Sequence, residues 1–239
     1  MSGVPDVSRV LVVTAHPDDV DFGVAGSVAT WTASGIEVAY CVVTDGDAGG
    51  FDPSVSRLAM RDIRRREQLA AAKVVGVTDV TFLGYPDGRL VPTLELRRDI
   101  SRVIRRFKPE RVVGQSPERN WQRIYASHPD HLAAGEATVC AVYPDSRNEF
   151  AHPELLAEGY EAHAVAELWV MAAPTRGAYV DVTECFDKKL DALRCHVSQE
   201  VDRDGGLEER IRGWLTANAR EASLPEGRLA EGFLRVDTR

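Results

Sequence analysis

The sequence predicts an α/β fold with a Rossmann-like, mostly parallel sheet flanked by helices, followed by a C-terminal helical and strand extension. The first observation is that short β-branched runs alternate with longer segments of helical periodicity in the first half of the chain. Such an alternation is typical of parallel strands joined by right-handed helical crossovers. The second is the length of 239 residues, of which 44% are hydrophobic and 28% charged. We therefore expect one domain over residues 1–239, with a core at about 8–172 and an extension at 173–239.

The core elements follow from local patterns. Strands are expected where apolar, β-branched residues run without interruption, because strands of a parallel sheet are buried on both faces. Helices are expected where apolar residues recur at helical spacing, and Gly35 and Gly76 are the stop signals of the first two. In chain order the prediction is a strand at 9–14, a helix at 22–34, a strand at 37–43, a helix at 56–75, a strand at 80–83, a helix at 93–107 and a strand at 111–114.

The second half of the chain continues the same alternation with weaker patterns. Two prolines within residues 144–154 indicate a long loop, and residues 225–227 indicate a turn. The remaining expected elements are helices at 131–142, 186–198 and 208–219 and strands at 168–172 and 232–236.

The charge and composition exclude several classes of partner. The formal net charge of −8 argues against binding to nucleic acid or to an anionic membrane surface. No run approaches the about 18 apolar residues of a membrane span, and the N-terminal residues do not resemble a signal peptide. The four cysteines are widely spaced and form no CxxC pair, which favours free thiols in a reducing cytoplasm. The oligomeric state stays open, a homo-oligomer included.

The residues that leave the first predicted strand carry an unusual set of polar side chains. His16, Asp18 and Asp19 follow this strand directly. Ligands of doubly wound sheets bind at the carboxyl ends of the strands, and a nucleotide-binding protein has a glycine-rich loop at this place. An imidazole and two carboxylates would repel a phosphate and would suit a divalent cation. The motif therefore favours a metal site over a nucleotide site.

A second His-Pro-Asp unit follows the fourth predicted strand. It spans residues 128–130 and is followed by His131, so it lies at the same edge of the sheet. Each unit by itself is weak evidence, because a histidine before proline is common in turns and an aspartate pair often caps a helix. Together they supply imidazole and carboxylate groups without a nearby thiolate, which is typical of catalytic zinc with three protein ligands.

At this point the chain resembles the LmbE-like (PIG-L) family of zinc-dependent N-deacetylases, which act on N-acetylglucosaminyl compounds and related amides. The resemblance depends on AHPDD at 15–19 and HPDH at 128–131. One departure is Val20, where the family commonly has glutamate; Asp21 follows it. Supporting segments are TDGDAGG at 44–50, Arg64 with Glu67, LGYPDG at 83–88, and His196-x-Ser198-Gln199.

The resemblance implies roles for individual residues. Arg64 would contact the substrate, and Asp47 and Asp87, which follow predicted strands, could reach sugar hydroxyls, although aspartates in such loops also form turns. The remaining roles concern the two motifs: His16, Asp19 and His131 as ligands of Zn²⁺ or of another divalent metal such as Fe²⁺, Asp18 as general base, His128 as oxyanion stabiliser or acid, and Asp130 as a neighbour that tunes or orients His128.

The two motifs and this resemblance together imply a zinc-dependent hydrolase, and the resemblance implies that it removes the N-acetyl group from an N-acetylglucosaminyl-type small molecule. The metal would polarise the amide carbonyl and acidify water, and a nearby carboxylate would accept the water proton. One alternative is an amidase that cleaves a larger sugar–thiol conjugate with the same site. A different class is a non-catalytic sugar- or metal-binding module on the same fold, which would need no general base. The sequence leaves the identity of the substrate open.

Overall fold

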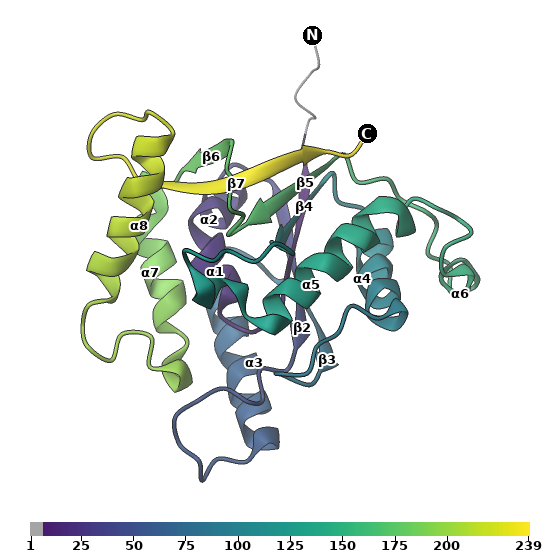
Figure 1. Cartoon of the computed structure of the whole chain (residues 1–239), viewed down its shortest axis with the longest axis horizontal. Helices are drawn as coiled ribbons and strands as arrows, with labels where there is room; N and C mark the ends of the chain where they lie inside the picture. The colour runs from purple at the N-terminus through teal and green to yellow at the C-terminus, as the bar shows by residue number, and fades with distance from the viewer. Residues whose placement is uncertain (1–6) are drawn as a thin grey trace.

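The computed structural model describes residues 7–239 and confirms the α/β fold with a mostly parallel sheet between helices (Figure 1). Residues 1–6, which belong to the segment assessed for a signal peptide, lie outside the described residues. The strands of the described chain form one sheet in the order β3-β2-β1-β4-β5-β7-β6. They are β1 (Arg9–Thr14), β2 (Glu37–Thr44), β3 (Asp79–Tyr85), β4 (Arg111–Gln115), β5 (Glu167–Met171), β6 (Ala178–Asp181) and β7 (Ala230–Asp237).

The first five strands are parallel and the last two are antiparallel to their neighbours. Strand β1 lies at the centre between β2 and β4, and β5 continues the parallel arrangement beyond β4. Strand β7 then pairs with β5 in the antiparallel direction and with β6 on its other side. Strands β2 and β3 are added on one side of β1, and the chain then crosses to the other side to form β4. The carboxyl ends of β1 and β4 therefore lie at the topological switch point, where doubly wound sheets have a crevice.

Helices cover both faces of the sheet (Figure 1). The α-helices are α1 (Asp19–Gly23), α2 (Ala25–Ala33), α3 (Arg57–Val74), α4 (Leu94–Phe107), α5 (Pro129–Cys140), α6 (Pro153–Ala157), α7 (Phe186–Arg194) and α8 (Leu207–Glu221). Short 3₁₀ segments are η1 (Ile124–Ser127), η3 (Thr183–Cys185) and η4 (Val197–Gln199), and η2 (Ala141–Asp145) is a π-helical turn. No helix of the described chain is both long and apolar enough to cross a bilayer.

Strand β1 explains the two-sided core. Its residues alternate between the two faces: Leu11 and Val13 belong to a cluster with α4 and α5, while Val10 and Val12 belong to a cluster with α2, α3 and α7. A continuous apolar run satisfies both faces at once. A third cluster, around Leu190 and Ile211, joins α7 to α8 in the C-terminal extension.

The structure corrects several predicted boundaries. The helix expected at 22–34 is two helices, because Val24 has non-helical backbone angles between α1 and α2. The helix expected at 131–142 begins at Pro129, since proline is well suited to a first helical turn and His128 supplies the cap. The loop expected at 144–154 contains η2 and the start of α6, and the helix expected at 186–198 ends at Arg194. Strand β6 was not predicted, because its four residues are only half-buried and show no alternation.

Candidate active site

The loop after β1 is held in place by side chains from other elements. The backbone N–H of Ala15 donates to the Gln115 side chain at the end of β4 (2.8 Å). The N–H of Asp18 donates to Gln68 Oε1 of α3 (2.8 Å), and Arg64 of α3 donates to the Pro17 carbonyl. Asp18 itself has a φ of 95°, a conformation that non-glycine residues rarely adopt. The surrounding contacts thus hold the first motif in a strained conformation.

The second motif forms the start of α5. His128 Nδ1 accepts a hydrogen bond from the backbone N–H of Asp130 (3.2 Å) and so caps the helix. The buried carboxylate of Asp130 accepts from the N–H groups of Gly88 (2.7 Å) and Leu90 (3.1 Å), which ties α5 to the loop after β3. His131 follows in the first turn of α5, where it faces the loop after β1.

The two motifs bring together potential metal-ligating atoms of three residues, with a different carboxylate oxygen of Asp19 facing each histidine. His131 Nε2 lies 3.2 Å from His16 Nδ1 and 3.0 Å from Asp19 Oδ1, and Asp19 Oδ2 lies 3.3 Å from His16 Nδ1. Ligand atoms about 2.0–2.1 Å from a tetrahedral zinc ion would be separated by roughly 3.4 Å. The donor atoms of His16, Asp19 and His131 therefore have the chemistry and nearly the spacing of a zinc site.

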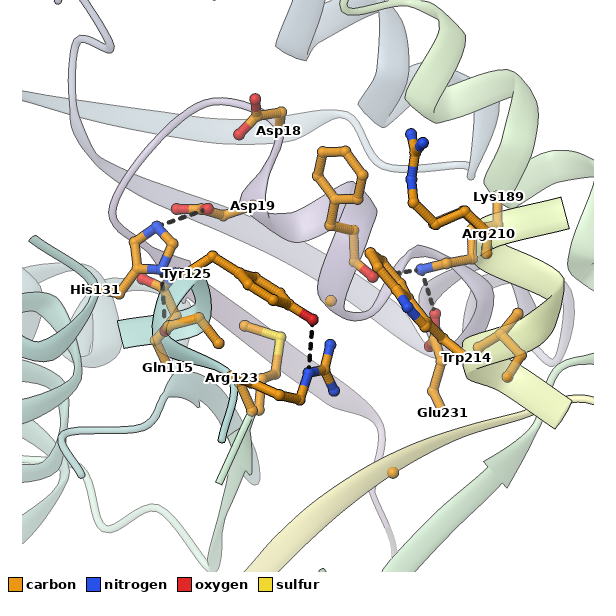
Figure 2. Close-up of a pocket in the computed structure, with 18 of the residues that line it drawn as sticks. Asp18, Asp19, Gln115, Arg123, Tyr125, His131, Lys189, Arg210, Trp214 and Glu231 are labelled. Carbon is orange, nitrogen blue, oxygen red and sulfur yellow. Dashed lines mark hydrogen bonds and ion pairs between the residues drawn. The ribbon is translucent and has the colours of Figure 1, made fainter. Parts of the chain in front are cut away.

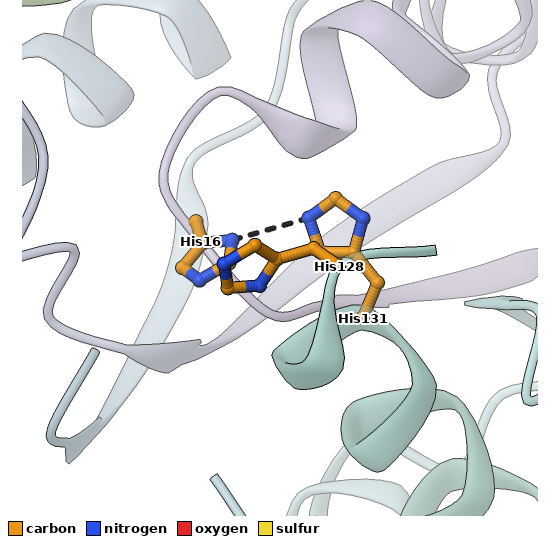
Figure 3. A group of neighbouring side chains, drawn as sticks. All are labelled: His16, His128 and His131. Atoms are coloured by element: carbon orange, nitrogen blue, oxygen red, sulfur yellow. Dashed lines mark hydrogen bonds between the residues drawn. The ribbon is translucent and has the colours of Figure 1, made fainter. Parts of the chain in front are cut away.

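The outer ring nitrogens of the two histidines are also engaged, as is usual for histidines that bind a metal. His16 Nε2 lies 3.1 Å from Asp87 Oδ1 and 3.2 Å from Asp130 Oδ2. His131 Nδ1 lies 3.4 Å from the carbonyl of Ala126. These contacts orient both rings, so that His16 Nδ1 and His131 Nε2 point toward each other (Figure 3).

The carboxylates around His16 favour a positive charge at this position. Burial lowers the pKa of His16, but hydrogen bonds to Asp130, Asp19 and Asp87 outweigh it and raise this pKa to about 12. Burial raises the pKa of Asp19, but its interactions with His131 and His16 outweigh burial and hold this pKa well below its usual value. Either an imidazolium or a metal ion can supply the charge that these carboxylates require.

Asp18 and His128 lie beside His16, Asp19 and His131 but take no part in the contacts that join these three residues. Burial raises the pKa of Asp18 to about 6, although Arg64 Nη2, 3.1 Å from Asp18 Oδ2, lowers it. Burial and the charges of His16 and His131 lower the pKa of His128. The His128 ring centroid lies 5.0 Å from that of His16 and 5.4 Å from that of His131 (Figure 3).

The side chain of Asp130 makes no hydrogen bond to His128, although its charge raises the pKa of His128, so its predicted role of tuning or orienting His128 stays a prediction. Its carboxylate contacts His16 Nε2 and the loop after β3, and only its backbone N–H contacts His128. The reason is helix capping: the His128 side chain turns back to the first free N–H of α5, while the Asp130 side chain points to the neighbouring loop. Asp130 thus contacts His16 through its side chain and His128 only through its backbone.

The three residues predicted to bind substrate lie behind the first motif. Arg64 is buried and donates to the carbonyls of Pro17 and Gly46 as well as to Asp18. Asp87 contacts His16, and Asp47 bonds to Arg57 (2.6 Å) and to the Asp87 N–H (2.9 Å). None of Arg64, Asp47 and Asp87 is among the residues that line the cavity described next. Their contacts support the motif loop, and their contact with substrate stays a prediction.

A cavity of about 580 Å³ opens from the donor atoms toward the C-terminal extension (Figure 2). Asp18, Asp19 and His131 line one side of it. The other side is formed by residues of β7 and α8, among them Glu231 and Trp214, and Arg123 and Tyr125, at the start of η1, lie between the two sides (Figure 2). No sequence motif indicated these four residues. Only an amphipathic pattern in α8 could have signalled an inward-facing surface, and that pattern does not distinguish a cavity from a core.

A buried network of hydrogen bonds supports the backbone of Asp18, and no sequence motif indicates it. Asp21 Oδ2 accepts from Gln68 Nε2 (3.0 Å) and lies 2.7 Å from His196 Nε2, and all three side chains are fully buried. Gln68 Oε1 in turn binds the N–H of Asp18. Asp21, one place beyond the family's usual glutamate, therefore takes part in the hydrogen bonding around the motif, although position 20 is valine.

Two of the supporting segments outside the two motifs also meet, the one with Arg64 and Glu67 and the one with His196 and Ser198. Glu67 of α3 accepts from the N–H and the hydroxyl of Ser198 in η4, both at 2.7 Å. This pair joins the Arg64–Glu67 segment to the segment that contains His196. The two segments thus brace α3, which holds Asp18 through Gln68 and Arg64.

Comparison with known proteins identifies the family of this chain. The family model PIG-L, described as GlcNAc-PI de-N-acetylase, matches residues 11–142. A diacetylchitobiose deacetylase of Thermococcus kodakarensis is 35% identical over 81% of this chain and 71% of its own length. A Bacillus anthracis protein assigned as an N-acetyl-alpha-D-glucosaminyl L-malate deacetylase is 32% identical, over 87% of this chain and 88% of that one.

A solved structure extends the likeness to nearly the whole chain. The N,N'-diacetylchitobiose deacetylase from Pyrococcus horikoshii, complexed with an inhibitor, has a TM-score of 0.89 and is 28% identical, covering 98% of this chain and 85% of that one. The named relatives are deacetylases, which hydrolyse carbon–nitrogen bonds other than peptide bonds. On these matches the chain is a hydrolase of the deacetylase class and belongs to the PIG-L (LmbE-like) family.

Proposed function

We propose that this chain is a metal-dependent N-deacetylase that hydrolyses the acetamide of an N-acetylglucosaminyl-type small molecule. The observation that carries the proposal is the convergence of His16, Asp19 and His131 at one side of the cavity, with Asp18 beside them. The names of the relatives support the substrate class, because they act on N-acetylated glucosamine compounds. A binding module would have no use for the additional carboxylate at this place.

The three converging residues would hold Zn²⁺, with Fe²⁺ as the alternative. When bound, such a metal polarises the amide carbonyl and lowers the pKa of water beside it. His16 and His131 present one ring nitrogen each, and their outer nitrogens are held by acceptors from the protein. The carboxylates of Asp87 and Asp130 near His16 would keep this ring in the orientation that a ligand needs.

Asp18 is assigned as the general base. Its carboxylate lies close to the donor atoms and lines the cavity, where it can take a proton from the attacking water. Burial places its pKa near the range in which a base works at neutral pH, and Arg64 and Gln68 hold the residue in position. As the carbon–nitrogen bond breaks, this proton passes to the departing amine, and the products are acetate and the free amino sugar.

His128 is assigned to the carbonyl oxygen. Its Nδ1 accepts from the Asp130 N–H, so in the neutral ring the proton is on Nε2. The lowered pKa of His128 favours this neutral form. Nε2–H can then donate to the negative charge that develops on the acetyl oxygen.

The first test is acetate release in the presence and absence of a chelator. The protein is incubated with N,N'-diacetylchitobiose and with N-acetylglucosaminyl malate, and acetate and primary amine are measured. We expect equal amounts of both products, loss of turnover after metal removal, and recovery on addition of Zn²⁺ or Fe²⁺. Turnover that survives complete metal removal, or substrate binding without any acetate release, would contradict the proposal.

The second test concerns His128. Replacement by alanine is expected to lower kcat by about 10²–10³-fold with a small change in KM, because a donor to the developing oxyanion acts mainly in the transition state. His128→Gln is the matched variant, since its amide can still donate, and it should retain more activity than His128→Ala. If both variants change only KM, His128 binds substrate and does not stabilise the oxyanion.

A further inference from the structure

Basic residues are concentrated in the cavity beyond the donor atoms, and most are neutralised by the protein. Arg123, Arg176, Lys189 and Arg210 line it. Three have carboxylate partners within 4.0 Å: Arg176 with Glu221 (2.6 Å), Lys189 with Glu231 (2.7 Å) and Arg210 with Asp204 (3.9 Å). Among the residues that the structure describes, none provides a carboxylate within this distance of Arg123. No carboxylate of the described residues therefore balances the charge of Arg123.

Aromatic groups hold Arg123 in the cavity. Its Nε donates to the hydroxyl of Tyr125 (2.9 Å), and its Cζ lies 5.4 Å from the Tyr125 ring centroid and 5.5 Å from that of Trp214. The hydrogen bond to Tyr125 uses Nε and leaves the two terminal amino groups without a hydrogen-bond partner in residues 7–239. Two such groups form a planar fork that fits a carboxylate or a phosphate, and its orientation is set in advance.

The position of this fork relative to the donor atoms indicates which part of a substrate it meets. Figure 2 shows Asp19 and His131 on one side of the cavity and Trp214 on the other, with Arg123 reaching into the space between them. The volume of about 580 Å³ is within the range of pockets that hold ligands larger than one sugar ring. A substrate with its acetamide at Asp19 and His131 would extend its remaining part toward Arg123 and Trp214.

We infer that Arg123, supported by Tyr125 and Trp214, binds an anionic group, a carboxylate or a phosphate, on the part of the substrate remote from the acetamide. The inference rests on the proposed function and narrows it to amino sugars with an acidic substituent. Trp214 presents an aromatic ring to the same part of the cavity, which suits a sugar ring or an apolar linker next to the anion. Arg123 is then a specificity-determining residue and takes no part in the reaction.

The decisive experiment compares anionic and neutral substrates in wild type and Arg123→Gln. The substrates are N-acetylglucosaminyl malate, N-acetylglucosamine 1-phosphate and neutral N,N'-diacetylchitobiose. We expect wild type to prefer at least one anionic substrate, and Arg123→Gln to lower the anionic-to-neutral ratio of kcat/KM by about 10- to 100-fold, mainly through KM. The substrate whose ratio falls more shows whether the group is a carboxylate or a phosphate.

Two further variants separate recognition of the anion from simple packing. Arg210→Gln removes a cavity-lining charge that has a carboxylate partner, and it should change the ratio less than about fivefold. Arg123→Lys keeps the charge without the planar fork and should be intermediate. If Arg123→Gln reduces activity on all three substrates equally, Arg123 merely braces η1 against α8 and the inference is wrong.

A binding measurement keeps the inference testable even if the proposed function fails. Wild type that releases acetate from none of the three substrates contradicts the proposed function. Calorimetric titration with L-malate and with inorganic phosphate needs no turnover, and we expect wild-type binding of at least one anion to weaken about 10-fold or more in Arg123→Gln. Equal binding by both proteins, or no binding by either, would overturn the anion subsite.

Discussion

Asp18→Asn is expected to lower kcat by about 10²–10⁴-fold, the contribution of a general base, while the metal content stays at the wild-type level. The asparagine amide cannot accept the water proton. The donor atoms of His16, Asp19 and His131 contact one another and not Asp18, so their arrangement should persist. The measurements are steady-state kinetics of acetate release and metal analysis by mass spectrometry on the same preparation.

Asparagine is the appropriate replacement because of the backbone. Asp18 has a φ of 95°, where asparagine is tolerated better than alanine, so alanine would add strain to the loss of the base. The matched control is Asp19→Asn, which weakens a proposed metal ligand of the same loop and should reduce metal content. Asp18→Asn protein that lacks metal, or that keeps more than a tenth of wild-type turnover, would contradict the division of roles between these two neighbours.

Lys189→Met is expected to lower the free energy of unfolding by about 3–5 kcal/mol, the cost of leaving a buried charge without its partner. Lys189 and Glu231 are almost completely buried, and Lys189 Nζ lies 2.7 Å from Glu231 Oε1. Lys189 also donates to the carbonyls of Asp21 and Phe22 (both 2.8 Å), which belong to α1. Glu231 accepts from two N–H groups of the first turn of α2, where a negative charge is favourable.

Two controls separate this buried pair from ordinary surface charges. The double variant Lys189→Met/Glu231→Gln should recover about 0.5–3 kcal/mol of the loss, because the remaining buried group is then neutral. Arg106→Met breaks a half-exposed pair with Asp79 (3.0 Å) and should change stability by less than about 1 kcal/mol. Urea unfolding measures all three, and a Lys189→Met loss no larger than that of Arg106→Met would show that the pair does not hold α1 and α2 to β7.

The motif residues show which parts of the site can be predicted from short sequence segments. His16, Asp19 and His131 could be expected to lie near one another because parallel strands end at a common edge, and the structure places their donor atoms 3.0–3.3 Å apart. Arg64 and Asp87 show the limit of the same reasoning. Both follow the family pattern into the neighbourhood of the site, yet their side chains turn toward Asp18 and His16 and not into the cavity. The end of a strand can be predicted from sequence, but the direction of a loop side chain depends on its hydrogen-bond partners.

By itself the sequence determined the α/β fold, the edge of the sheet that carries the chemistry, and the residues of the two motifs, because strand burial, helix periodicity and the common edge of parallel strands are local or topological properties. Only the tertiary structure decided what surrounds these motifs. Arg123 and Trp214 are far apart in the sequence and belong to no motif; packing of α8 against α7 helps to bring them to one cavity. The two motifs are therefore encoded in short segments, whereas the far side of the cavity, where we infer that the substrate is selected, depends on long-range packing.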